Sequence, residues 1–118
     1  MDPNLLTSKI NAGESFLLAN DGQFLGKLSL NQFDAESISN SYGLFGSQYS
    51  ATSIFNKYGN YGSQYSALSP FNRFTSTPPM IYLKGRFFGY LTKNVYMGPS
   101  SIDPDNLIFY LRAQNLNF

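Results

Sequence analysis

The sequence predicts an α+β domain: a small four-stranded antiparallel sheet from two related hairpins, a C-terminal helix, and a long irregular segment rich in aromatic residues, Gly and Ser. Three observations predict these parts. A segment at 22–33 returns in related form at 85–96, a 16-residue repeat fills much of 34–79, and an Asp-Pro pair begins a helical pattern at Asp103. Residues 1–118 are expected to form a single domain.

The composition excludes several classes of chemistry. The chain is 42% hydrophobic and 17% aromatic, which favours a packed core rich in Phe and Tyr. It contains no Cys and no His, so disulfides, thiol catalysis, most transition-metal sites and most general-base mechanisms lack their usual residues. We therefore predict no catalytic residues, no metal site and no cofactor, and we do not expect an enzyme.

The first residues predict a short helix over 3–11. Asp2 can cap a helix with its side chain, and Pro3 is favoured at the first helical position. Gly13 then supplies a residue at which such a helix ends.

A hairpin is predicted over 15–33. Two β-prone runs flank Asp21-Gly22, the strongest two-residue signal for a hairpin turn. An isolated hairpin is only marginally stable in water, so this one needs a partner.

The segment 34–79 contains the repeats. Its shared pattern reads Ser-[Ile/Pro]-x-Asn-x-[Tyr/Phe]-Gly-x-[Phe/Tyr]-Gly-Ser-x-Tyr-Ser, and the hexapeptide Gly-Ser-Gln-Tyr-Ser-Ala occurs at both 46–51 and 62–67. We expect this segment to wrap the sheet, with Ser and Asn side chains capping turns. Sequences of low complexity tolerate drift, whereas these copies stay in phase, which argues against a disordered or prion-like segment.

The partner of the first hairpin is predicted over 80–96. Both hairpins share the pattern Gly-[Gln/Arg]-Phe-[Leu/Phe]-Gly-x-Leu-[Ser/Thr]-x-Asn-x-[Phe/Tyr]. We expect the two to pair into one antiparallel sheet. Gly26 and Gly89 hold the same place in the pattern and are expected to mark a bulge or a close backbone approach.

The C-terminal helix is predicted over 103–114. Asp103 is suited to the N-cap and Pro104 to the first helical position. The apolar side chains expected to face the sheet are Leu107, Ile108 and Leu111.

The repeats and the first hairpin resemble a set of uncharacterised bacterial proteins with tandem Asn-x-Tyr-Gly-x-Tyr-Gly-Ser-x-Tyr-Ser repeats. The matching residues are 22–31 and 37–74, about half of the chain. The chain departs from that pattern at Ser41 and Lys57, which stand where the resembling proteins usually have Pro. The resemblance implies no activity.

Two interpretations of the repeat tyrosines are open. In the first, which we favour, each ring plugs its own turn and its hydroxyl bonds to the backbone. In the second, the rings face solvent as platforms that stack on sugars or bases, beside a weakly basic face. The candidate binding residues are Tyr42, Tyr49, Tyr58, Tyr61, Tyr65, Lys57 and Arg73.

These features favour a non-enzymatic structural or interaction module that meets a protein partner or copies of itself through the Tyr/Gly/Ser surface. Residues 37–102 contain no acid, and the overall charge of +1 opposes association little. The alternative is a binding module for glycan or single-stranded nucleic acid. The sequence shows neither a signal peptide nor a membrane span, which predicts a cytoplasmic chain, or an exported one if a leader was removed.

Overall fold

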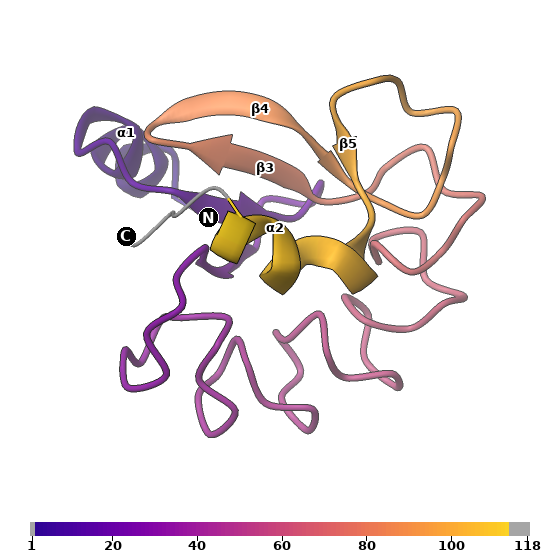
Figure 1. Cartoon of the computed structure of the whole chain (residues 1–118), viewed down its shortest axis with the longest axis horizontal. Coiled ribbons are helices and arrows are strands. Elements are labelled where there is room, and N and C mark those ends of the chain that lie inside the picture. The colour runs from indigo at the N-terminus through magenta and orange to yellow at the C-terminus, as the bar shows by residue number, and fades with distance from the viewer. Residues whose placement is uncertain (1, 114–118) are drawn as a thin grey trace.

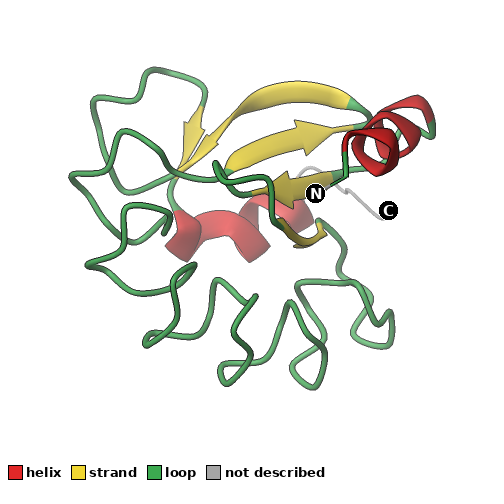
Figure 2. Ribbon diagram, turned by 180° about the vertical axis from the view of Figure 1, so that it is seen from behind, coloured by secondary structure: helices red, strands yellow, loops and turns green. Residues whose placement is uncertain are grey.

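The computed structural model of the protein describes residues 2–113 (Figure 1). Its helices and strands follow one another in this order: α1 (Pro3–Asn11), β1 (Phe16–Leu18), β2 (Phe24–Lys27), β3 (Met80–Leu83), β4 (Arg86–Leu91), β5 (Ser101–Ile102), the 3-10 turn η1 (Pro104–Asn106) and α2 (Leu107–Ala113). The predicted α+β class is therefore confirmed. Figure 2 shows the long stretch between β2 and β3 as loops and turns, which lie on the side of the molecule that α2 faces.

The strands form one sheet in the order β2-β1-β3-β4-β5. The two hairpins join as predicted, because β1 and β3 pair antiparallel with Leu17 opposite Ile81. The prediction of four antiparallel strands is incomplete, since β5 adds a fifth strand that runs parallel to β4, with Tyr90 opposite Ser101. A strand of two residues carries no alternating pattern, so periodicity does not reveal it.

The close backbone approach predicted at the two equivalent glycines is confirmed. Gly26 has a φ of +113°, and beside it Ser37 forms a parallel bridge with Lys27. A Cβ on Gly89 would overlap the carbonyl of Ser100 on the incoming β5 segment. Both hairpins therefore receive a returning segment in parallel at the same place, and the absence of a side chain makes the room.

Both helices begin as predicted. Asp2 Oδ1 accepts the N–H of Asn4 at 2.8 Å, and Asp103 Oδ1 accepts the N–H of Asp105 at 2.9 Å. The predicted C-terminal helix starts as η1 and continues as α2; residue 114, its predicted last residue, lies outside the described residues. Within this helix Leu107 and Leu111 are buried, as expected.

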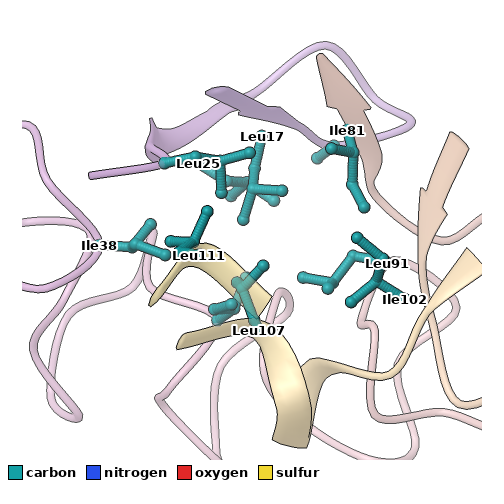
Figure 3. Close-up of a cluster of buried hydrophobic side chains, with 11 residues drawn as sticks. Leu17, Leu25, Ile38, Ile81, Leu91, Ile102, Leu107 and Leu111 are labelled. Carbon is teal, nitrogen blue, oxygen red and sulfur yellow. The ribbon is translucent and has the colours of Figure 1, made fainter. Parts of the chain in front are cut away.

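The main core lies between the sheet and α2 (Figure 3). Its buried side chains come from the sheet, from the segments beside it and from α2: Leu17, Ala19, Leu25, Leu28, Ile81, Leu91, Ile102, Leu107 and Leu111. Two further members, Ile38 and Ile54, come from the repeats. The repeat segment is thus attached to the same core as the sheet, on the side that α2 covers.

A smaller aromatic cluster lies where α1 packs, around the buried rings of Phe16, Phe24 and Phe45. Phe16 also stacks on Tyr82 with ring centroids 4.8 Å apart. The expectation of a core rich in Phe and Tyr is nevertheless wrong, because the buried apolar side chains of residues 2–113 are mostly aliphatic and include no Tyr. Most Phe and Tyr side chains of residues 2–113 therefore lie outside the buried core.

Candidate functional site

Residues 34–77 form a ribbon of consecutive turns, which we call the turn ribbon. Each turn closes when a backbone N–H donates to the carbonyl three or four residues earlier, and the residue that closes one turn begins the next. The residues at these junctions are Asp34, Ser37, Asn40, Gly43, Ser47, Ser50, Ser53, Asn56, Gly59, Ser63, Ser66, Ser69, Asn72 and Thr75. The steps that begin at Gly43 and Gly59 span four residues, and the other steps span three. Each 16-residue period therefore contains one four-residue step and four three-residue steps.

Side chains complete all the turns except those that begin at Gly43 and Gly59. At every junction except the two glycines, the side-chain oxygen accepts the N–H two residues later, at 2.9–3.3 Å. This confirms the expectation that Ser and Asn cap the turns. The asparagines add a second bond, since the Nδ2 of Asn40, Asn56 and Asn72 donates to the carbonyl six residues earlier at 3.1–3.2 Å. The ribbon therefore satisfies many of its own polar groups without strand partners.

The inner edge of the turn ribbon is fixed by the Ser-[Ile/Pro] pair of each repeat. Ser37, Ser53 and Ser69 have no exposed surface, and Ile38 and Ile54 join the core beneath α2. These serines are small, so the backbone can approach the core closely. Their hydroxyls can be buried because each accepts a backbone N–H two residues later. One edge of the ribbon is thereby buried, and the other faces solvent.

The outer edge carries large rings that are almost fully exposed. The pattern Asn-x-[Phe/Tyr] occurs five times, and in each case Asn Oδ1 accepts the N–H of the aromatic residue. The exposed fractions of these rings are Phe33 93%, Tyr42 98%, Tyr58 96%, Phe74 88% and Tyr96 92%. Two Ser-Gln-Tyr turns add Tyr49 and Tyr65, each 84% exposed. We call these seven residues the aromatic rim; five belong to the turn ribbon, whereas Phe33 directly precedes it and Tyr96 lies between β4 and β5.

The favoured sequence interpretation, that each repeat ring plugs its own turn, is therefore wrong for Tyr42, Tyr49, Tyr58 and Tyr65. The Ser and Asn side chains already close the turns, so the rings are not needed there. Phe33, Phe74 and Tyr96 were not among the predicted binding residues. The shared Asn-x-[Phe/Tyr] tripeptide, which also ends both hairpin patterns, is the signal that identifies them.

Tyr61 differs from the rim. It is partly buried against the main core, and its hydroxyl donates to Asp21 Oδ2 at 2.7 Å, so its partner is a carboxylate rather than the predicted backbone group. Burial, together with the Asp21 carboxylate, raises the pKa of Tyr61 to about 12. Tyr61 thus ties the turn ribbon to the first hairpin.

This tie predicts a pH dependence. The folded chain holds the Tyr61 proton more tightly than the unfolded chain, whose tyrosine pKa is 10.0. The contribution of protonated Tyr61 to the free energy of unfolding is therefore complete below pH 10.0 and is lost as the pH rises toward about 12. Over that window we expect the free energy of unfolding to fall more steeply for the wild type than for Tyr61→Phe. Urea denaturation of both chains at several alkaline pH values measures the difference, and parallel slopes would contradict the assignment.

Lys57 and Arg73 occupy equivalent places in two Asn turns, directly before Tyr58 and Phe74, and both are exposed. The structure therefore brings predicted cations and rings together on the outer edge. Lys93, in contrast, is bound by acids, with Nζ 3.1 Å from Asp103 Oδ1 and 2.5 Å from Asp105 Oδ2. These bonds raise the pKa of Lys93, and the bond to Asp105 has the largest effect.

The acids of the ribbon, Asp34 and Glu36, are also paired. Asp34 Oδ2 lies 3.1 Å from Lys27 Nζ, and the N–H of Glu36 together with this ammonium lowers the pKa of Asp34. Glu14 and Glu36 both face Lys9, at 3.4 and 3.9 Å, in an open hollow next to α1. Among residues 2–113 there is no group of three or more acidic side chains arranged to hold a metal ion.

Comparison with protein-family models, curated proteins and solved structures finds no match to the chain. Within the described residues, no helix is both long and apolar enough to cross a membrane. The candidate site accordingly depends on its own geometry: a self-capped ribbon, buried along one edge, that holds five of the seven rim rings in solvent, with Phe33 and Tyr96 on similar Asn turns outside it.

Proposed function

We propose that the chain is a non-enzymatic interaction module whose working surface is the aromatic rim. The observation that carries this proposal is the exposure of the rings. Tyr58 is 96% exposed and therefore buries almost no apolar area, so the hydrophobic effect gives the fold almost nothing from it. The chain nevertheless repeats this arrangement of Asn and an exposed ring five times. A ring that does not stabilise its own fold is well placed to contact another molecule.

The backbone beneath the rings supports the proposal. Asn56 holds the N–H of Tyr58 with Oδ1 and the carbonyl of Ser50 with Nδ2, so the turn that carries the ring is bonded on both sides. A partner that binds such a ring orders one side chain and little backbone. Binding to a preorganised turn loses less conformational entropy than binding to a free loop.

A non-enzymatic role agrees with the chemistry of the surface. The chain has no His or Cys, the two carboxylates of the turn ribbon, Asp34 and Glu36, are paired with lysines, and Asp21 accepts from Tyr61. The two partner classes expected from the sequence, protein or self on one side and glycan or single-stranded nucleic acid on the other, would both use the rim. Tyr rings suit each of these classes, because they join an apolar face to a polar hydroxyl.

The test compares the wild type with a triple variant, Tyr42→Ala, Tyr58→Ala and Phe74→Ala, which removes the three equivalent rings of the Asn turns. We expect each substitution to change the free energy of unfolding by less than about 0.5 kcal/mol, as for exposed residues that make no contacts. The matched control is Phe109→Ala, which removes an equally apolar ring, 76% exposed, from α2 instead of the rim.

Each variant is tested in three assays. Light scattering over a wide concentration range detects self-association, migration in native gels containing neutral polysaccharides detects glycan binding, and the third assay measures binding of single-stranded DNA. The proposal predicts that the wild type and the Phe109→Ala chain show at least one interaction, and that the triple variant loses it while remaining folded. An interaction that survives in the triple variant, or a wild type that is inert in all three assays, would overturn the proposal.

A further inference from the structure

We infer that the aromatic rim binds a neutral polysaccharide, with its rings stacked on the apolar faces of successive sugar units. This inference rests on the proposed function and names the partner for the same surface. It depends on three properties of the rim: the isolation of its rings, the polar groups between them, and its charge.

The rings of the rim stand apart from one another. The ring pairs that pack together within residues 2–113, such as Phe24 with Phe45 and Tyr82 with Phe87, include no member of the rim. A stable protein–protein interface normally buries a continuous patch of about 800 Å² on each partner, with an apolar centre. Single rings separated by polar turns do not provide such a patch. They suit a ligand that offers apolar faces one at a time.

Polar groups able to bind hydroxyls lie between the rings. Gln48 and Gln64 directly precede Tyr49 and Tyr65, and both amides are exposed. The Gln48 amide donates to the hydroxyl of Tyr49 at 3.1 Å. The apolar face of the ring and the polar amide therefore lie next to each other. A sugar ring has the matching character, because its C–H groups form an apolar face and its hydroxyls project from the edge. Amide groups can donate to and accept from such hydroxyls.

The charge of the rim favours a neutral polymer over a nucleic acid. The ribbon between Ser37 and Thr75 contains no acid and only two cations, Lys57 and Arg73. Proteins that bind single strands combine stacking with a positively charged groove that follows the phosphates. Two separated cations give too little charge for such a groove. Stacking on a neutral chain needs no counter-charge.

The repetition of the rim implies a polymeric ligand. Figure 1 shows the turn ribbon as successive loops along one side of the molecule, and the 16-residue period places equivalent rings at Tyr42, Tyr58 and Phe74. A monosaccharide can contact one such ring, whereas a flexible chain can contact several. Each further contact then occurs at a high effective concentration, so weak single contacts add up to measurable binding.

The experiment is affinity electrophoresis in native gels that contain soluble neutral polysaccharides, namely xyloglucan, galactomannan, mixed-linkage β-glucan and dextran, each run separately. We expect at least one of them to retard the wild-type chain, and free glucose, mannose or galactose not to reverse the retardation. Tyr42→Ala, Tyr58→Ala and Phe74→Ala should each weaken binding by about three- to tenfold, the scale of one aromatic contact. The triple variant should migrate as it does without polysaccharide.

Two variants separate stacking from other effects. Tyr58→Phe keeps the ring and should bind within about twofold of the wild type, because the face rather than the hydroxyl makes the contact. Phe109→Ala should be retarded like the wild type. Added salt should leave the retardation unchanged, in contrast to a phosphate-dependent interaction. Retardation that persists in the triple variant would overturn the inference.

Other outcomes distinguish a wrong partner from a wrong surface. If no polysaccharide retards the wild type, but single-stranded DNA binds or the chain self-associates in a way that the triple variant abolishes, the rim remains the working surface and the polysaccharide inference is overturned. If neither polysaccharide, DNA nor self-association depends on the rim, both the inference and the proposed function are overturned.

Discussion

Replacing Gly62 by Ala will destabilise the protein by about 3 kcal/mol or more, whereas the same change at Gly59, three residues earlier, will cost less than about 1 kcal/mol. Both glycines belong to the same Gly-x-[Phe/Tyr]-Gly unit of the repeat. Neither has a φ in the left-handed region, so the backbone conformation is open to Ala at both positions. The expected difference therefore comes from space alone.

The space differs because of what the backbone does at the four-residue step. A Cβ on Gly62 would lie 2.7 Å from the carbonyl oxygen of Ile54 and closer still to that of Asn56, and neither carbonyl can move without breaking the turns it belongs to. The atoms nearest to a Cβ on Gly59 would belong to the side chain of Asn56, beginning at 3.2 Å. Overlap with backbone forces a rearrangement, while contact with a side-chain amide needs a small adjustment.

Urea denaturation of the two variants beside the wild type measures this difference. Gly46→Ala, in the preceding repeat, is an internal replicate of Gly62→Ala, because a Cβ on Gly46 would overlap the carbonyl of Asn40. Gly43 does not replicate Gly59, since its Cβ would lie 3.1 Å from the backbone carbonyl oxygen of Ala35. Equal stabilities for the Gly62→Ala and Gly59→Ala chains would show that the ribbon does not close as tightly as the structure has it.

The second large effect is expected at the asparagines. Asn56→Ala will lower the free energy of unfolding by about 2–3 kcal/mol, because it removes the acceptor for the Tyr58 N–H and the donor to the Ser50 carbonyl, which lie at 3.0 and 3.1 Å. Asn56→Asp keeps the acceptor but places a carboxylate against that carbonyl. It is expected to be at least as destabilising as Asn56→Ala at neutral pH.

Ser63→Ala is the matched control, because Ser63 caps its turn through one bond, to the N–H of Tyr65 at 3.2 Å. Its removal is expected to cost about 1 kcal/mol. Urea denaturation compares the three variants. An Asn56→Asp chain as stable as the wild type would mean that the bond from Nδ2 to Ser50 adds nothing, and the turns would then be held by the acceptor alone.

These variants explain why the repeat has its particular residues. Ser and Asn are the residues whose short side chains close a turn on the backbone. Each repeat Asn also donates through Nδ2 to a second carbonyl, and the hydroxyls of Ser37 and Ser66 do the same. Gly62 stands where the ribbon crosses its own backbone. Each of these requirements is local, which is why the predicted capping by Ser and Asn is confirmed.

The hairpins show the same division between local and non-local information. Asp21-Gly22, together with the shared pattern at 22–33 and 85–96, was sufficient to predict the pairing of two hairpins. The sequence does not predict β5, because Ser101 and Ile102 form a strand only by pairing with Tyr90 and Leu91, where Gly89 leaves room for Ser100. A contact between segments ten or more residues apart has no period for the sequence to display.

The sequence by itself determined the period of the repeat, the capping residues, the helix starts and the two hairpins, since all of these depend on backbone preferences and on bonds within a few residues. Only the tertiary structure decided which edge of the ribbon is buried. A serine with no exposed surface, such as Ser53, and an aromatic ring in open solvent, such as Tyr58, reverse what hydrophobicity predicts. The reason is physical: the core beneath α2 is filled by Ile38, Ile54 and the aliphatic residues of the sheet, so the rings of the aromatic rim are left on the outside.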